Sequence, residues 1–220
     1  MKFKTEMHCH TQESSLRCGK IPTKDVVEAY INADYSTLVL TNHFGAKHET
    51  DKGNNHDIEI FLKSYEIAKD AAKGRINIIL GMEINLSENK NDYLIYGITE
   101  DFIYKNPHMY KLRIEDFSAF IHENGLLIYQ AHPFRNHMTV VYPAFLDGIE
   151  VYNAHPRHDS RNSISKAWAE LYDIKTISGS DTHQPPDLAR GGILTETEIT
   201  NSDELLDVLK NNNYELIISD

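Results

Sequence analysis

The amino-acid sequence predicts a single α/β domain, residues 1–220, in which a mostly parallel sheet closes into a barrel. A chain of 220 residues with 40% apolar content can bury one substantial core. Short runs rich in Val, Ile, Leu and Tyr recur along the chain, and most precede a segment of helical periodicity. Strands that alternate with helices favour a parallel sheet buried on both faces, and about seven or eight such strands favour a closed barrel over an open sheet.

The predicted strands are, in chain order, FKTEMH, TLVLTNH, NIILGMEI, YLIYGI, LLIYQAH, GIEVYN, KTISGSD and ELIIS. Helical periodicity is expected over residues 24–34, 57–73, 114–124, 161–172 and 203–211. Capping-type residues such as Thr23 and Ser202 are expected to open helices, and Gly74 and Gly125 to close them. The least regular segments, 44–56 and 99–112, should form loops over one end of the barrel.

The charge balance limits the classes of partner. The sequence has 33 acidic and 22 basic residues and a net charge of −11, which opposes general nucleic-acid binding and a broad polybasic membrane patch. It shows neither a signal-peptide pattern nor a long apolar run, so we expect a cytoplasmic protein. Cys9 and Cys18 are too few for a disulfide framework and lack the paired CxxC pattern of structural zinc sites.

Metal-type ligands stand at the C-terminal ends of several predicted strands. They are His8, His10, His43, Glu83, His132, Asp181 and His183. In β/α barrels the strand ends converge on one mouth, where active sites are built. Side chains at positions i and i+2 of a strand share a face, so His8 with His10, and Asp181 with His183, can each present two ligands to one centre.

These donors suit zinc, manganese or iron, and a carboxylate such as Glu83 can bridge two ions. A lone strand-end histidine is more often solvated or hydrogen-bonded, and Glu83 could instead form a salt bridge. The joint pattern favours metal, because an ionised carboxylate after the apolar run INIILGM is costly unless it is paired or metal-bound. The other loop and helix histidines, His48, His56, His108, His122 and His137, are not assigned to the site.

The segments HCHT, TNHF, GMEI, AHPFR, GIEVYN and SGSDTH, in this order, resemble the PHP (polymerase and histidinol phosphatase) family. Members of that family are metal-dependent phosphoesterases with a distorted seven-stranded, TIM-like barrel. The resemblance implies that His8, His10, Glu83 and Asp181 serve one metal of a multinuclear cluster. It also implies that His43, His132 and His183 complete the neighbouring ions.

The sequence departs from the family pattern in three places. Asn42 stands where the family commonly has an aspartate, and the loop SSLRCGK replaces one that usually supplies an Asp or His ligand. Glu13 is the nearest candidate replacement for that ligand. The fourth strand, YLIYGI, does not end in the histidine that the family often places there. Two or three divalent ions per chain are therefore expected.

The expected chemistry is attack on a small phosphorylated metabolite by a metal-activated hydroxide held by Glu83 and Asp181. Arg135 is the first candidate for binding the substrate phosphate, since a guanidinium binds phosphate through two parallel hydrogen bonds. Asn153, His155 and Arg157 follow in the segment YNAHPRHDSRN. The chain contains no GxSxG, P-loop or GxGxxG motif.

Two alternatives remain open from the sequence. A metal-dependent hydrolase of an amide or ester would use the same kind of centre on a carbonyl substrate. A PHP-type domain that binds metal without catalysis would be compatible with the altered TNH and SSLRCGK segments. The sequence does not select the substrate, the physiological metal or the oligomeric state.

Overall fold

The computed structural model describes residues 2–50 and 52–219. Within these residues one sheet has the strand order β10-β9-β1-β2-β4-β5-β6-β7-β8, and β3 pairs with β4 outside this path. The strands are β1 (Phe3–Glu6), β2 (Tyr35–Leu40), β3 (His43–Gly45), β4 (Asn77–Asn85), β5 (Asp92–Tyr96), β6 (Leu127–Gln130), β7 (Gly148–Asn153), β8 (Lys175–Gly179), β9 (Gly191–Thr195) and β10 (Glu215–Ile218).

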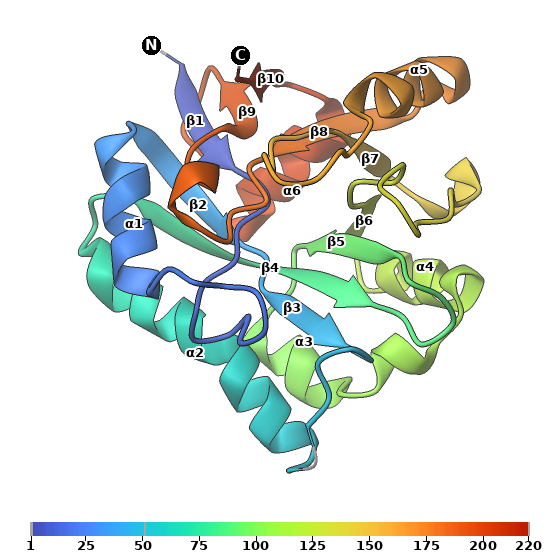
Figure 1. Ribbon diagram of the computed structural model, residues 1–220, viewed down its shortest axis with the longest axis horizontal. Coiled ribbons are helices and arrows are strands. Elements are labelled where there is room, and N and C mark those ends of the chain that lie inside the picture. The colour runs from blue at the N-terminus through green and yellow to red at the C-terminus, as the bar shows by residue number, and fades with distance from the viewer. Residues whose placement is uncertain (1, 51, 220) are drawn as a thin grey trace.

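Helices lie around the outside of this sheet (Figure 1). They are α1 (Thr23–Asn32), α2 (Asn54–Ala72), α3 (Glu100–Lys105), α4 (Ile114–Glu123), α5 (Asn162–Tyr172) and α6 (Ser202–Asn211). None of the helices in the described part of the chain has the length and apolar character needed to cross a bilayer.

The sheet curves into a nearly closed barrel. Strands β1, β2 and β4 run parallel to one another, as do β6, β7 and β8. The seam between β8 and the β9–β10 pair is bridged by Ser178, whose Oγ donates to the carbonyl of Ile217 and accepts from the N–H of Gly192. The predicted α/β barrel in one sheet is thus confirmed.

Two strands run against the predicted parallel direction. β5 is antiparallel to both β4 and β6, and β9 is antiparallel to both β1 and β10. No helix separates β4 from β5, and a direct connection of this kind joins antiparallel strands. The reversal places the first residue of β5, Asp92, opposite Asn85 at the end of β4.

The five predicted helices are confirmed, each with ends shifted by at most a few residues, and Gly74 and Gly125 follow the ends of α2 and α4 with φ +73 and +74, as predicted. The predicted N-caps are wrong. Thr23 and Ser202 are the first helical residues, and Asn201 caps α6 by accepting from the N–H of Glu204. The prediction that segment 99–112 is a loop was wrong. The segment contains α3, whose N-terminus is capped by Thr99, and a 3-10 turn at Met109–Lys111. Segment 44–56 overlaps β3 and α2 at its ends, and its residue 51 lies outside the described residues.

Strands β3 and β9 were also missed by the sequence prediction. β3 has three residues, and β9 begins with a glycine pair that resembles a turn. Gly192 has φ +123, and a Cβ there would lie 2.2 Å from the carbonyl oxygen of Thr5. Glycine is therefore required where β9 approaches β1 closely.

The barrel interior is apolar at one end. Tyr96, Tyr129 and Ile193 pack there with Leu205 and Leu209 of α6 in one buried cluster. Gly97, just after β5, lies against Leu206 of α6, so α6 covers the end of the barrel opposite to the start of β5. The other end, which we call the mouth, is formed by the C-terminal ends of β1, β4, β6 and β8.

Candidate metal centre

The structure brings the seven predicted metal ligands together at the mouth. His8 and His10 follow β1, His132 follows β6, and Asp181 and His183 follow β8. His43 and Glu83 lie opposite each other in the paired strands β3 and β4. His8 and His10 are completely buried, and Glu83 and Asp181 are each only 1% exposed.

The backbone beyond β1 and β8 aligns the two predicted ligand pairs. Cys9 and Thr182 form an isolated parallel bridge, in which the N–H of His10 donates to the carbonyl of Thr182 at 3.0 Å. The neighbours of the bridged residues are thereby placed side by side. This is the local reason why His8 and His10 face Asp181.

One group of ligand atoms consists of His8, His10 and Asp181. Nε2 of His8 lies 3.1 Å from Nε2 of His10. Oδ1 of Asp181 lies 3.4 Å from the first nitrogen and 3.5 Å from the second. All three side chains thus direct a donor atom toward one point.

Glu83 connects this group to the remaining histidines. Its Oε1 lies 3.1 Å from Nε2 of His132 and 3.4 Å from Nε2 of His8. Its Oε2 lies 2.7 Å from Nδ1 of His43 and 3.2 Å from Nε2 of His10. The carboxylate therefore contacts imidazoles on both sides, as a carboxylate that bridges two ions requires.

Two of the predicted ligands adopt unusual backbone conformations. His132 has φ +29 and Asp181 has φ +51, in a region that costs energy for residues other than glycine. The N–H of His132 donates to Oε2 of Glu150 at 2.8 Å, which fixes its backbone. Such strain is typical of functional positions that the surrounding structure holds in place.

Glu150 is a supporting residue that the sequence analysis did not single out. It is completely buried, and its Oε1 lies 2.9 Å from Nδ1 of His8. Its Oε2 also accepts from Nδ2 of Asn153 at 2.9 Å. A carboxylate on Nδ1 sets the ring so that Nε2 faces the centre, the arrangement common for metal-binding histidines.

The loop SSLRCGK, which departs from the family pattern, contributes hydrogen bonds that support the cluster. Ser15 Oγ lies 3.2 Å from Nδ1 of His10 and donates to Oδ1 of Asn42 at 2.8 Å. Asn42 Oδ1 also accepts from the N–H of Thr11, so the amide oxygen performs the accepting role that a carboxylate could. Glu13 is not brought into the cluster, because its Oε2 accepts from both the N–H and Oγ1 of Thr23 at the start of α1.

Asp92 is a second acidic residue at the mouth that the sequence analysis missed. It lines the same cavity as Glu83 and His132, and only 8% of it is exposed. Its Oδ1 accepts from Nζ of Lys47 at 3.0 Å. This acidic residue precedes the predicted strand YLIYGI and does not follow it, because β5 is antiparallel and begins at the mouth.

The predicted substrate-binding residues surround the cluster, and the two arginines among them are already paired with acids. Nη2 of Arg135 donates to Oδ2 of Asp181 and to Oδ1 of Asn153, each at 2.8 Å. Arg157 forms two hydrogen bonds with Asp187, and its Nη2 lies 2.9 Å from Nε2 of His155. The cavity at the mouth, about 350 Å³, is lined by Arg135, His155 and Arg157.

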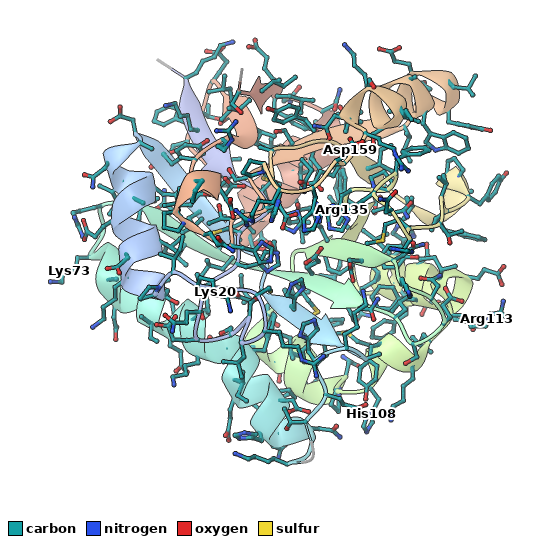
Figure 2. The ribbon with its side chains drawn as sticks, viewed as in Figure 1. Lys20, Lys73, His108, Arg113, Arg135 and Asp159 are labelled. Atoms are coloured by element: carbon teal, nitrogen blue, oxygen red, sulfur yellow. The ribbon has the colours of Figure 1, made fainter. Side chains whose placement is uncertain are left out.

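Two further cations, Arg17 and Lys20, line the same cavity and come from the loop after β1. In the view of Figure 2, Lys20 and Arg135 lie toward the middle of the face shown, whereas Lys73 and Arg113 lie at its edge. Four basic residues therefore converge on the mouth of a protein whose net charge is −11.

The buried charges at the centre depend on one another. Burial disfavours the charged form of His8, but the carboxylates of Glu150, Asp181 and Glu83 outweigh burial and raise its pKa well above the ordinary value. Burial also opposes ionisation of Asp181, yet His8 and Arg135 hold its pKa well below the ordinary value. The three buried carboxylates of Glu83, Glu150 and Asp181 thus require positive charge at this point.

Other groups at the mouth stay neutral at pH 7. Burial lowers the pKa of His183 to about 3 and that of His155 to about 4. Burial raises the pKa of Cys18 to about 12, so its side chain is a thiol. Neutral imidazoles keep a lone pair for a metal ion or a hydrogen-bond donor.

The donor set fits divalent metal ions. Imidazole nitrogens and carboxylate oxygens converge in overlapping groups, which are His8, His10 and Asp181; His8, Glu83 and His132; and His10, His43 and His183. Nδ1 of His132 is buried without a hydrogen-bond partner among the described residues, and Oε2 of Glu83 lies close to nitrogens of His43 and His10 but meets neither in hydrogen-bond geometry. Buried polar atoms are normally satisfied, and a bound ion would satisfy Glu83.

Comparison with family models finds the PHP domain over residues 6–217. Comparison with curated protein sequences finds no significant match. Among solved structures, one match is a two-domain protein from Bacteroides vulgatus described as containing a predicted PHP-like metal-dependent phosphoesterase. It is 19% identical with a TM-score of 0.70, over 100% of this chain and 65% of that one, so this chain spans slightly less than two thirds of that protein.

Two other structures share the fold. An amidohydrolase from Chromobacterium violaceum is 16% identical with a TM-score of 0.57, over 94% of this chain and 96% of that one. The lesion-specific endonuclease PfuEndoQ from Pyrococcus furiosus is 17% identical with a TM-score of 0.60, over 98% of this chain and 58% of that one. At such identities the likeness concerns the fold, which hosts more than one chemistry.

Proposed function

Because the chain belongs to the PHP domain family, we propose that it is a metal-dependent phosphoesterase that hydrolyses a small phosphorylated metabolite. The observation that carries this proposal is the arrangement at the mouth. Seven candidate nitrogen and oxygen ligands lie within one cluster, five of them buried, and four basic side chains line the cavity in front of it.

Two or three divalent ions, zinc, manganese or iron, are the proposed cofactors. His8, His10 and Asp181 would hold one ion, and Glu83 would join it to a neighbour held with His132 or His43. When bound, such ions acidify a water molecule into a nucleophile at neutral pH and neutralise phosphate charge. Glu83 and Asp181 would hold this nucleophile, as the sequence predicts, and Asp92 is a further candidate ligand.

The chain's own residues would bind and orient the phosphate. Arg135 reaches the cluster directly, since its Nη2 lies 2.8 Å from Oδ2 of Asp181. With Asp181 engaged by an ion, this guanidinium would be available to a phosphate oxygen at the same place. Asn153 lies beside Arg135, and Arg157 with the neutral His155 forms the adjacent wall.

A small substrate is favoured over nucleic acid. A long polyanion needs an extended basic surface, whereas this protein carries a net charge of −11 and four basic residues line the one cavity at the mouth. The endonuclease among the structural matches nevertheless makes oligonucleotides a necessary part of any substrate panel.

Hydrolysis of an amide or carboxylic ester is the alternative chemistry, since the same type of centre serves carbonyl substrates. The convergence of Arg135, Arg157, Arg17 and Lys20 on the mouth favours a phosphate substrate. A PHP domain that binds metal without catalysis is the remaining alternative.

The test compares three substrate panels with one protein preparation. Protein loaded with zinc, manganese or iron is assayed against phosphomonoesters, carboxylic esters and amides, and short oligonucleotides, with and without a chelator. We expect chelator-sensitive phosphate release from at least one small phosphomonoester. Cleavage confined to carbonyl substrates, or to oligonucleotides, would contradict the proposal, as would bound metal without turnover of any panel.

A further inference from the structure

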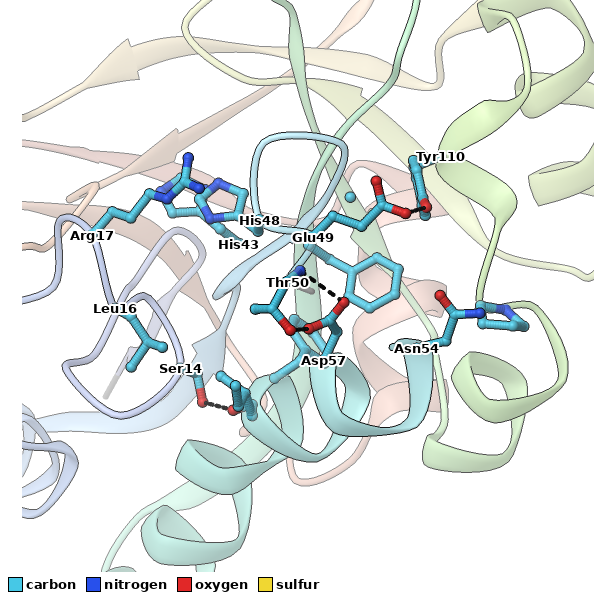
Figure 3. A pocket seen from close by; sticks show the side chains of 15 residues that line it. Ser14, Leu16, Arg17, His43, His48, Glu49, Thr50, Asn54, Asp57 and Tyr110 are labelled. Carbon is cyan, nitrogen blue, oxygen red and sulfur yellow. Dashed lines mark hydrogen bonds between the residues drawn. The ribbon is translucent and has the colours of Figure 1, made fainter. Parts of the chain in front are cut away.

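A second cavity of about 90 Å³ lies next to the mouth. Figure 3 shows it between the loop after β1, the segment between β3 and α2, and the 3-10 turn that carries Tyr110. The site described above does not use this cavity. We call it the side pocket and define it by Leu16, Phe44, Ile60, Phe61 and Tyr110.

The walls of the side pocket are largely apolar and aromatic. Phe44, Phe61 and Tyr110 are at most 6% exposed, and the rings of Phe44 and Phe61 are packed edge to face at 5.4 Å. Rings held this rigidly give a preformed surface for another ring or alkyl group. Leu16, which is 59% exposed, forms the outer rim on the loop after β1.

The acidic groups in the side pocket are already engaged. Glu49 accepts from the hydroxyl of Tyr110, and Asp57 accepts from the N–H and hydroxyl of Thr50. Their negative charge would repel an anionic group placed inside the pocket. With two carboxylates and one guanidinium, that of Arg17, in its lining, the pocket suits an uncharged group better than a second phosphate or carboxylate.

The side pocket is continuous with the metal centre. His43 lines both cavities, and its Nδ1 lies 2.7 Å from Oε2 of Glu83. Arg17 also lines both cavities. His48, whose ring stacks on that of His43 at 4.5 Å, lines the side pocket beside it.

We propose that the side pocket binds the leaving group of the substrate and selects phosphate esters of uncharged alcohols that carry an apolar ring. A phosphate at the cluster would place its ester oxygen beside His43 and Arg17, and the attached ring would extend toward Phe44, Phe61 and Tyr110. This inference rests on the proposed phosphoesterase function and adds the class of leaving group to it.

Binding of non-hydrolysable phosphonates to the metal-loaded protein tests the pocket without requiring turnover. Benzylphosphonate and methylphosphonate share one headgroup and differ in the ring alone. Burial of a phenyl ring is expected to tighten binding at least about tenfold, measured by calorimetry. A carboxylate on the far side of the ring, as in 4-carboxybenzylphosphonate, should remove most of this gain.

Two substitutions in the side pocket and one control substitution test whether the ring binds in the side pocket. Ile60→Trp fills the side pocket from α2 and should abolish the benzyl advantage while methylphosphonate binds as before. Leu171→Trp, on the exposed face of α5, is the matched control and should keep the advantage. Leu16→Ser replaces an exposed loop residue, so the fold should tolerate it. It should also lower the affinity for benzylphosphonate relative to methylphosphonate, but by less than Ile60→Trp does.

Equal affinity for benzylphosphonate and methylphosphonate, or no binding of either, would overturn the assignment of the side pocket. An advantage that survives Ile60→Trp in a folded protein would overturn it as well. The proposed function is judged separately by phosphate release in the substrate panel. Hydrolysis of benzyl phosphate and ethyl phosphate at equal rates would reject the assignment of the side pocket as the leaving-group site. It would still support the proposed phosphoesterase function.

Discussion

Oε1 of Glu150 lies 2.9 Å from Nδ1 of His8, on the side of the imidazole that faces away from the cluster. The other nitrogen, Nε2, lies within 3.4 Å of both Glu83 and Asp181. Glu150 also accepts from the N–H of His132, so one buried carboxylate supports two ligands. The candidate metal centre is therefore built in two layers, and the outer layer fixes the orientation of the inner one.

The role of Glu150 can be tested with Glu150→Gln. The amide keeps the shape but weakens the interaction with Nδ1 of His8, and loss of such partners typically reduces metal affinity by about 10–100-fold. Competition titration against a chromophoric chelator measures the change. Glu170→Gln, on the exposed side of α5, is the matched control. Unchanged affinity in a folded Glu150→Gln protein would contradict the positioning role.

Arg135 is expected to contribute to binding of the phosphate group. Arg135→Met should lower kcat/KM for a phosphomonoester by about 10–100-fold, the loss typical of a hydrogen bond to a charged group. Arg113→Met removes a peripheral guanidinium that is paired with Glu88 and should have no effect (Figure 2). Equal kcat/KM values for Arg135→Met and Arg113→Met would show that Arg135 does not bind the phosphate.

Metal should stabilise the folded protein. A ligand that binds the native state alone contributes about 2.7 kcal/mol at a hundredfold excess over its Kd, which corresponds to a rise in Tm of several degrees for a domain of this size. Thermal denaturation with and without chelator measures the shift. Asp181→Ala lacks an oxygen shared by His8 and His10 and should lose most of it. The same rise in Tm in the wild-type protein and in Asp181→Ala would show that the ion does not bind at Asp181.

The pair formed by Arg157 and Asp187 predicts a pH-dependent contribution to stability. Burial opposes ionisation of Asp187, but hydrogen bonds from Arg157 and from the N–H groups of His183 and Gln184 outweigh it and hold its pKa below the ordinary value of 3.8. A depressed pKa gives stability that is present above the unfolded-state pKa and is lost as the pH falls through the folded-state value.

Asp187→Asn should therefore lower the free energy of unfolding at pH 7 by about 1–3 kcal/mol, as expected for lost hydrogen bonds to a charged group. The difference from the wild-type protein should shrink once the pH falls below about 3.8. Urea denaturation at several pH values measures both effects. A difference that does not change with pH would show that the charge of Asp187 is not the cause.

The parts of the site that were predictable from sequence lie at the ends of parallel strands. His8, His132 and Asp181 each follow a recognisable apolar strand, and parallel strands end at the same edge. Asp92 was not predictable in this way, because the direction of β5 depends on its pairing with β4 and β6. Nothing in the local pattern of YLIYGI indicates which end of that strand lies at the mouth.

Residues that act through distant partners also escaped the sequence analysis. Glu150 contacts His8 across 142 positions of the chain, and its surroundings in GIEVYN give no sign of this contact. Glu13 was a reasonable candidate by spacing, but the start of α1 engages its carboxylate through Thr23. The missed strands β3 and β9 have three and five residues, so their periodicity is too short to identify them.

The cluster at the mouth is proposed to be a metal centre that hydrolyses phosphomonoesters. The most direct test measures bound metal and phosphate release together in the wild-type protein and in Asp181→Ala. The account predicts about two or three divalent ions per wild-type chain, with chelator-sensitive release, and loss of both bound metal and release in the variant. Phosphate release that persists in Asp181→Ala after its metal is gone would contradict the account.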